Sequence, residues 1–324
     1  MPLSNLASYP PTMNEFISHW EQVNAAIDPD LTIVAPDKTS VTRATFTALR
    51  ETLLVQVQNV IGFLNDKEIA RGDIRLRKTR LLALFNEFNA VLDGYYVGTP
   101  FINARPYAPS SSDAVEVFLM PMRDALSLWQ KLAAGPAPAG ITLPLVLADG
   151  TGSDDFEELI QGLQSAQAAE ANANQNAVLA RGKRDITMAL AKALMVTYRK
   201  AVPARCVLHP ELVAAMPAVT PPPGHTPDPV NASAVFQAPD QAKIVYDASE
   251  ETTLARYELR GNPGDTYDEN DAVTITSHLP ADPREFLTGF GLTQPGTHAA
   301  FKVFVVLDTG NEAGSATMIV ARPG

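Results

Sequence analysis

The segment that most resembles a chemical motif is Asp149 to Asp155, with the sequence DGTGSDD, which follows an apolar run and precedes a helical pattern. A glycine-containing loop before a helix can bind phosphate through its backbone N–H groups. Here no lysine follows the glycines, and Asp154 and Asp155 occupy the start of the helix, where they would repel a phosphate and favour the helix dipole. As an EF-hand loop the segment lacks the glycine and the final glutamate, because Asp154 and Ile160 stand there. The pattern therefore predicts a helix cap.

The sequence gives little support for a metal site or for a catalytic nucleophile. Cys206 and His209 have the spacing of a zinc-ligand pair, but a structural zinc needs four ligands and the chain has a single cysteine. No Gly-x-Ser-x-Gly motif is present. The five histidines are scattered at His19, His209, His225, His278 and His298. We expect no catalytic constellation, no metal and no cofactor, and hence a protein that is not an enzyme, although distant residues can converge in space.

The loop of residues 265–271 is strongly acidic, with Asp268, Glu269 and Asp271 close together. Such carboxylates can hold calcium at weak affinity. A solvated turn, in which Asp and Asn side chains shape the backbone, is the favoured interpretation.

A basic run covers residues 71–80. Its first three residues, Arg71-Gly72-Asp73, match the integrin-binding tripeptide, but we interpret Gly72 as a helix stop and Asp73 as the next helix cap. The remaining charges are Arg75, Arg77, Lys78 and Arg80. They predict a solvated helix face; the sharper alternative is a contact surface for the acidic part of a neighbouring copy.

Helical periodicity dominates the first 200 residues. Apolar side chains at three- and four-residue steps predict helices over residues 11–27, 40–64, 73–95, 113–133 and 153–201. A polar break is expected at 65–72. Asp113 with Glu116 has capping-box spacing, and Ser153 or Asp154 caps the longest helix. Long helices joined by loops indicate an antiparallel bundle.

A proline-rich segment at residues 217–229 follows, with six prolines in thirteen residues. Prolines at this density favour a stiff, extended spacer. We therefore predict three parts: a helical bundle domain over 1–216, the linker over 217–229, and a second domain over 230–324.

The second domain shows strand alternation. Ala255, Tyr257 and Leu259 alternate with Arg256, Glu258 and Arg260, which is typical of a strand with one buried face. Seven strands are expected over residues 234–236, 243–247, 254–260, 272–278, 285–288, 300–307 and 316–321. Seven short strands in about a hundred residues indicate a β-sandwich.

Residues 291–320 resemble the end of a fibronectin type III module, in which a Leu-x-Pro-Gly-Thr turn leads into a strand, a Gly-Asn-type hairpin and a last strand that begins with serine. The matching residues are Leu292, Pro295, Gly296, Thr297, Asn311, Gly314 and Ser315, with one extra residue before the proline. The resemblance covers about residues 230–324 and implies a seven-stranded sandwich.

Two positions depart from that pattern. The usual buried Trp of the second strand is missing, and Tyr246 is expected in its place. The usual Tyr at the entry to the sixth strand is replaced by the region of His298. The helical half resembles no family.

The last two strands are apolar on both faces. Phe301, Val303, Val305 and Leu307 are expected in the core, while the opposite face of the same strand still carries apolar residues. Strands that are covered on both faces have this composition. We predict one apolar patch, covered by the helical domain or by another subunit, made of Phe304, Val306, Met318 and Val320.

Composition limits the function classes. The chain has 324 residues, 46% of them hydrophobic, and a formal charge of -11, which disfavours a nucleic-acid surface. No basic and apolar leader pattern begins the sequence, and no run approaches the roughly 20 apolar residues of a membrane span. A cytoplasmic location is the default expectation.

The sequence thus predicts an α+β multidomain protein, an N-terminal all-α bundle followed by a fibronectin type III-like β-sandwich. We expect a non-enzymatic structural subunit that self-assembles into an oligomer, filament or tube. The alternative is a binding or adaptor module that recognises a protein or a glycan through the sandwich.

Overall fold

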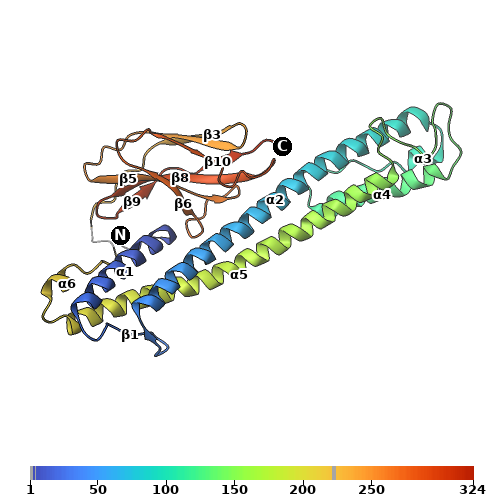
Figure 1. Ribbon diagram of the computed structural model, residues 1–324. Coiled ribbons are helices and arrows are strands. Elements are labelled where there is room, and N and C mark those ends of the chain that lie inside the picture. Colours follow the sequence, from blue (N-terminus) through green and yellow to red (C-terminus); the bar gives the residue numbers. More distant parts are fainter. Residues whose placement is uncertain (1–2, 4, 221–223) are drawn as a thin grey trace. The chain divides into compact units, whose positions relative to one another are not determined.

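The computed structural model describes residues 3, 5–220 and 224–324 (Figure 1). The chain divides into two compact units. Unit 1 comprises residues 1–65, 173–293 and 297–322, and unit 2 comprises residues 66–172, 294–296 and 323–324. Helical segments come first and antiparallel sheets follow, so the predicted α+β architecture is confirmed.

The helical elements are η1 (Leu6–Ser8), α1 (Tyr9–Ala26), α2 (Arg43–Tyr95), α3 (Pro100–Asn103), α4 (Val115–Ala133), α5 (Ser153–Arg205) and α6 (Pro210–Ala214). A small hairpin, β1 (Ile33–Val34) with β2 (Ser40–Val41), links α1 to α2. Both α2 and α5 contribute residues to both units.

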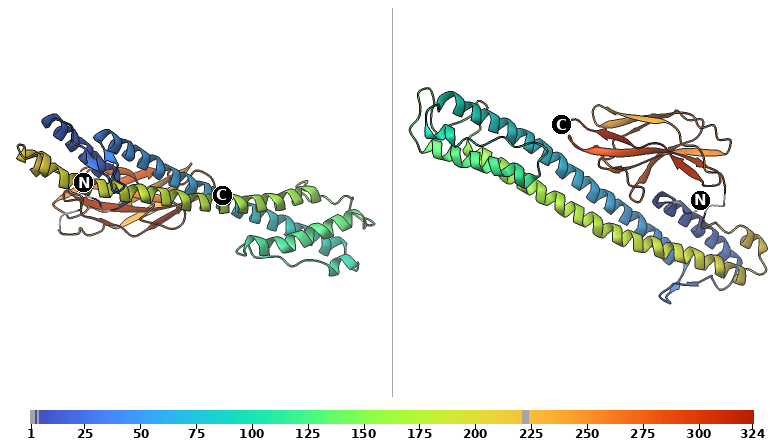
Figure 2. Two further views of the ribbon diagram at one scale, coloured as in Figure 1. Left: turned by 90° about the horizontal axis from the view of Figure 1, so that it is seen from below. Right: turned by 180° about the vertical axis from the view of Figure 1, so that it is seen from behind.

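In unit 1, α1 packs on the first part of α2 and the last part of α5 (Figure 2). Trp20 of α1 is fully buried, and its ring centroid lies 4.8 Å from that of Tyr198 on α5. Closer to the boundary of the unit, Ala177 and Ala180 of α5 pack on Val60 of α2. Alanines at this contact let two helix backbones approach closely.

The predicted helix break at residues 65–72 is wrong, because α2 runs through it without interruption. Its polar residues face partners: Glu68 is buried and lies 3.0 Å from Arg71, and Arg71 Nε donates to Glu170 of α5 at 2.7 Å. Gly72 and Asp73 are therefore helix interior, and neither ends nor caps a helix. The polar stretch had suggested a solvent-exposed break, but its charged side chains pair with one another inside the protein.

Unit 2 has its own core, formed by the second part of α2, by α4 and by the first part of α5. Phe88 stacks on Trp129 with ring centroids 4.9 Å apart, and Trp129 Nε1 donates to the carbonyl of Leu145 at 3.0 Å. The predicted capping box is wrong: α4 begins after Ala114 without a side-chain cap, and Asp113 instead accepts from the N–H of Ser110 at 2.9 Å.

Eight strands among the described residues build the sandwich, one more than expected. They are β3 (Ala232–Gln237), β4 (Gln241–Tyr246), β5 (Leu254–Pro263), β6 (Val273–His278), β7 (Glu285–Thr288), β8 (His298–Leu307), β9 (Glu312–Gly314) and β10 (Met318–Ala321). One antiparallel sheet has the order β10-β8-β5-β6, with β9 also paired to β8; the other has the order β3-β4-β7. The additional strand, β9, is the short continuation of the last hairpin.

The sandwich core lies between these sheets. Tyr246 is buried there and stacks on Phe286 with ring centroids 5.0 Å apart; burial raises its pKa to about 12. Ser315 bridges the gap between β9 and β10, because its hydroxyl accepts from the N–H of Val303 at 3.0 Å. The chain thus crosses from β9 to β10 without leaving the N–H group of β8 unpaired.

The predicted domain boundary at residues 217–229 does not coincide with the boundary between the two units. The units divide within α2 and α5, and helices and sandwich share unit 1. Residues 221–223 of the predicted linker lie outside the described residues. The division at 217–229 stays a prediction about which part folds alone.

Candidate functional site

The outer face of the larger sheet carries three charged side chains of β5. Arg256, Glu258 and Arg260 share this face, as their alternation indicates, but Glu258 and Arg260 are only 5% and 2% exposed. In the neighbouring strand Phe304 stands opposite Glu258. The alternation predicted one buried face for this strand, and the structure buries most of the charged face as well.

The charges on this face satisfy one another. Glu258 accepts from Arg256 Nε at 2.7 Å through one carboxylate oxygen and from Arg260 Nη2 at 2.6 Å through the other. Arg260 also donates to Glu312 of β9 at 2.9 Å. The Thr274 hydroxyl of β6 donates to Glu258 at 3.3 Å. Three strands, β5, β6 and β9, therefore meet in one ionic cluster.

These pairs hold the charges in place. Burial by itself raises the pKa of Glu258, but the charges of Arg260 and Arg256 outweigh it, so the pKa lies below its usual range. Burial likewise lowers the pKa of Arg260, and the carboxylates of Glu312 and Glu258 outweigh it and raise that pKa. A general acid or base works best with a pKa near the operating pH. Both groups are shifted away from neutrality, which suits a structural role.

Phe304 belongs to the same cluster. The Arg260 guanidinium lies 4.1 Å from the centroid of its ring. On the other side a Cβ atom at Gly314 would lie 2.8 Å from Phe304 Cζ, so that only glycine leaves room for the ring. An arginine over an aromatic face is stabilising.

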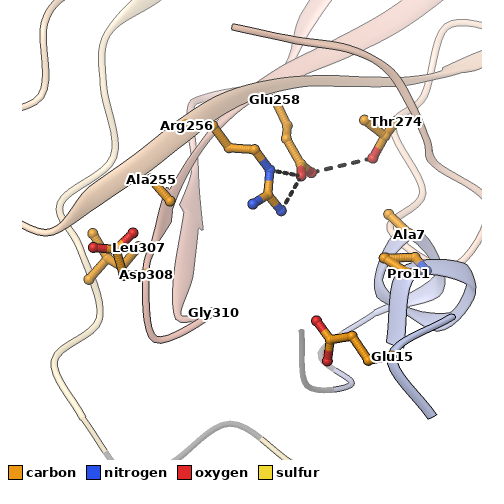
Figure 3. A pocket seen from close by; sticks show the side chains of 10 residues that line it. All are labelled: Ala7, Pro11, Glu15, Ala255, Arg256, Glu258, Thr274, Leu307, Asp308 and Gly310. Carbon is orange, nitrogen blue, oxygen red and sulfur yellow. Dashed lines mark hydrogen bonds and ion pairs between the residues drawn. The ribbon is translucent and has the colours of Figure 1, made fainter. Parts of the chain in front are cut away.

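A cleft of about 650 Å³ lies beside the cluster, between the sheet and the start of the helical region (Figure 3). Arg256, Glu258 and Thr274 line it from the sheet, and Glu15 of α1 lies on the facing helix. The remaining lining residues are Ala7, Pro11, Ala255, Leu307, Asp308 and Gly310. The cleft is open and carries charges of both signs.

The four residues of the predicted apolar patch do not form one surface. Phe304 and Val306 lie on the outer face of β8, and both are buried within the chain. Met318 pairs with Phe301 and belongs to the sandwich core, as does Val320. Residues that stand opposite each other on neighbouring strands share a face. The register therefore places Phe304 and Val306 on one side of the sheet and Met318 and Val320 on the other.

The basic run also differs from the prediction. Arg77 lies 2.8 Å from Asp73 within α2, and Arg80 forms an ion pair with Asp149. Lys78 is buried, donates to the carbonyl of Ser111 at 3.3 Å and to that of Asp113, and burial lowers its pKa. Arg75 and Arg80 are the exposed members of the four, and Arg75 Nη1 donates to the carbonyl of Gly296 at 3.0 Å. All four side chains thus have partners inside unit 2.

The acidic loop has one buried member. Asp268 and Glu269 are exposed, whereas Asp271 is 1% exposed. Asp271 accepts from Arg181 Nε at 2.7 Å and from Arg184 Nη1 at 2.9 Å, both on α5. The predicted pairing of this loop with the basic run of a neighbouring copy stays a prediction; within the chain, Asp271 pairs with α5.

The segment 149–155 contains the start of α5, but the predicted caps are wrong, because Ser153 and Asp154 are the first two residues of the helix. The Asp155 carboxylate accepts from the N–H of Gly152 at 2.8 Å, and Asp149 accepts from the N–H of Thr151 at 3.0 Å. Its carboxylates therefore serve the backbone groups that a phosphate would have used.

Cysteine and histidine side chains are used in packing. Cys206 is buried in the core of unit 1, and burial raises its pKa. His19 is also buried: its Nε2 donates to the carbonyl of Leu212 at 2.7 Å, and its Nδ1 lies 2.7 Å from the Tyr198 hydroxyl. Nowhere in the described residues do three His, Cys, Asp or Glu side chains gather as a metal ion would require. The described helices include none with the length and apolar character of a membrane span.

One helical face of unit 1 remains uncovered. A shallow groove between α2 and α5 is lined by Asn59, Phe63, Leu179 and Lys183, among others. Leu179 is exposed, and Ile186, two turns further along the same row of α5, is 73% exposed. Large aliphatic side chains stand in solvent here, and this surface had no place in the sequence prediction.

Two further residues escaped the sequence interpretation, Arg181 and Arg184. Their spacing of three places both on one face of a helix, which was the available signal. What they bind lies 87 or more positions further along the chain, and only the fold brings Asp271 to them.

No family model matches the chain, and no curated protein matches it. Among solved structures, a Fn3-like protein from Clostridium thermocellum matches with 20% identity and a TM-score of 0.24, covering 31% of this chain and 97% of that one. A structure described as a myokine matches with 14% identity and a TM-score of 0.25, covering 31% of this chain and 100% of that one.

The pectate lyase PelI from Erwinia chrysanthemi, in complex with tetragalacturonic acid, matches with 21% identity and a TM-score of 0.24. The match covers 28% of each chain, so this chain spans less than a third of that enzyme. All three likenesses cover less than a third of this chain and leave its function to be argued from its own residues.

Proposed function

We propose that the protein is a non-enzymatic structural subunit that self-assembles through the exposed face of α2 and α5 in unit 1. The observation that carries this proposal is the exposure of Leu179 and Ile186 along one row of α5. Burying one such aliphatic side chain contributes roughly 1.5 to 3 kcal/mol. Two copies that met through this face would together bury two Leu179 and two Ile186 side chains.

The chemistry of the neighbouring positions supports a helix-to-helix contact. Val55 of α2 is exposed, and Asn59 and Gly62, four and three residues further on, continue its row with small or uncharged side chains. Gly182 lies between Leu179 and Ile186 on α5, and a Cβ added there would meet nothing within 4 Å. Small residues beside large ones allow ridges of one helix to enter grooves of another.

A binding module is the second candidate, favoured by the outer face of the β3-β4-β7 sheet. Val235, Val245 and Leu287 are exposed there, beside an ion pair between Lys243 and Glu285 at 2.7 Å. We propose that this sandwich is a fibronectin type III-like module and that this face would receive a protein or glycan. Aliphatic side chains around one charged pair fit a protein surface better than a sugar.

Sedimentation of the full chain over a range of concentrations tests the first proposal. The parent is expected to associate, and Ile186→Glu is expected to remain folded and monomeric, because a charge there would be buried in the contact. Val235→Glu, at another exposed aliphatic position, on the sandwich, is the matched control and should associate like the parent.

A parent that stays monomeric at high concentration would refute self-assembly and leave the binding module as the better proposal. If Val235→Glu abolishes association and Ile186→Glu does not, the contact between copies is made by the sandwich and the helical interface is wrong.

A further inference from the structure

The contact between the sandwich and α5 in unit 1 is centred on one buried carboxylate. Asp271, in the loop between β5 and β6, is 1% exposed and accepts from Arg181 and Arg184. Arg184 is itself 3% exposed. Hydrogen bonding to Asp271 is the largest cause of the raised pKa of Arg181. The carboxylate is therefore the shared acceptor of two fixed positive charges.

Little apolar surface accompanies this ionic contact. Within the described residues, Val273 and Phe290 are the sandwich side chains that pack against the core of the helices, and both are only partly buried there. A polar contact follows nearby, in which the Asn5 amide donates to Glu312. Contacts between domains that are small and polar allow relative motion unless specific bonds prevent it.

Competing carboxylates surround the pair of arginines. Arg184 Nε also donates to Asp185 at 2.9 Å, and Asp268 adds to the negative charge near Arg181. If Asp271 left, the arginines would keep a carboxylate neighbour on their own helix. The open arrangement is thus not left with an uncompensated buried arginine, which lowers the cost of opening.

We propose that Asp271 is an ionic latch, which holds the sandwich against α5 through Arg181 and Arg184 and whose release lets the two separate within unit 1. Release would also widen the cleft of Figure 3, because its two walls come from the sheet and from the N-terminal helical segment. The latch then sets access to Arg256 and Glu258 in that cleft. Because the holding force is electrostatic, added salt favours release.

Hydrogen exchange of the full-length protein tests the latch with Asp271→Asn, which removes the charge and keeps the shape. The expected result is exchange at least about tenfold faster in β6 and in α5 near residues 181–188, with β8 and unit 2 unchanged. The parent in high salt should change at the same two segments and to a smaller extent. Glu269→Gln is the matched control, because Glu269 is exposed in the same loop, and this variant should exchange like the parent.

Two results would overturn the latch. Exchange in β6 and α5 that is the same in Asp271→Asn and the parent would show that the carboxylate does not hold the contact. Faster exchange throughout, β8 included, would show that Asp271 is needed for folding. Arg181→Gln guards against the second case, because it keeps the pair with Arg184; the latch requires from it an intermediate increase confined to the same two segments.

Discussion

A carboxylate in a buried sheet face needs positive partners, and Glu258 has one on each side along its own strand. Arg256 and Arg260 stand two residues before and after it, where the pleat brings side chains to one face. The cost of taking Glu258 out of water is offset only while both partners remain. The role of each residue in this cluster is therefore shared and cannot be assigned to it alone.

Glu258→Gln is expected to destabilise unit 1 by about 3 kcal/mol at neutral pH, because the buried Arg260 and the half-buried Arg256 both lose a charged acceptor. The folded-state pKa of Glu258 is lowered from its usual 4.5, so its stabilising contribution is present above that pH and is lost as the pH falls through the folded value. The difference in unfolding free energy between parent and variant should thus shrink below about pH 4. Urea unfolding at pH 7 and pH 3 measures this, and a difference that does not change with pH contradicts it.

At the scale of elements, glycines occur in two different environments. The glycine of a strand has no room for a side chain, whereas the glycine of a helix has room for one. Gly314 of β9 lies against the ring of Phe304, whereas a Cβ added at Gly62 of α2 would meet nothing within 4 Å. The same substitution therefore has opposite consequences in the two elements.

Gly314→Ala should cost about 1 to 3 kcal/mol through overpacking, and Gly62→Ala should contribute about 1 kcal/mol by favouring the helix. Thermal unfolding of both variants beside the parent gives the comparison. It should be made under conditions where all three are monomeric, since Gly62 lies on the helical face proposed as a contact. Equal shifts of the same sign would show that the two environments were misjudged.

At the scale of the whole molecule, helices and sandwich share unit 1, yet the sandwich has a separate core between its own two sheets. A closed core with antiparallel pairing can support independent folding. Asp271 would lose its arginines in an isolated sandwich, but it lies in a loop and would then be free to meet water.

Residues 230–324 expressed alone are therefore expected to fold, with a β-rich circular dichroism spectrum and a cooperative unfolding transition. The isolated fragment should be less stable than in the full chain, because Val273 and Phe290 lose their helical neighbours. A strongly helical spectrum would contradict the division at the proline-rich segment, and an unfolded spectrum would show that the helices are required.

The periodicities of the sequence determined the type of most elements. Spacing of three and four residues identified α1, α4 and α5, and alternation identified seven of the eight strands of the sandwich. These patterns are local consequences of how a helix or strand buries one face, so they can be read without knowing the neighbours. The helix start within residues 149–155 followed from the same local logic, whereas the predicted caps Ser153 and Asp154 were wrong. The core position of Tyr246 was expected from the resemblance to a fibronectin type III module.

Tertiary structure decided what each charged or apolar face meets. The polar stretch in α2 continued as helix because Arg71 found Glu170, and Glu258 was buried because two arginines accompanied it. The strand register put Met318 in the core and Phe304 on the opposite face, although both are equally apolar in the sequence. Asp271 met α5 because the fold brought the loop there. Each of these outcomes depends on pairing between residues distant in the chain, and no local pattern encodes which distant partner will be present.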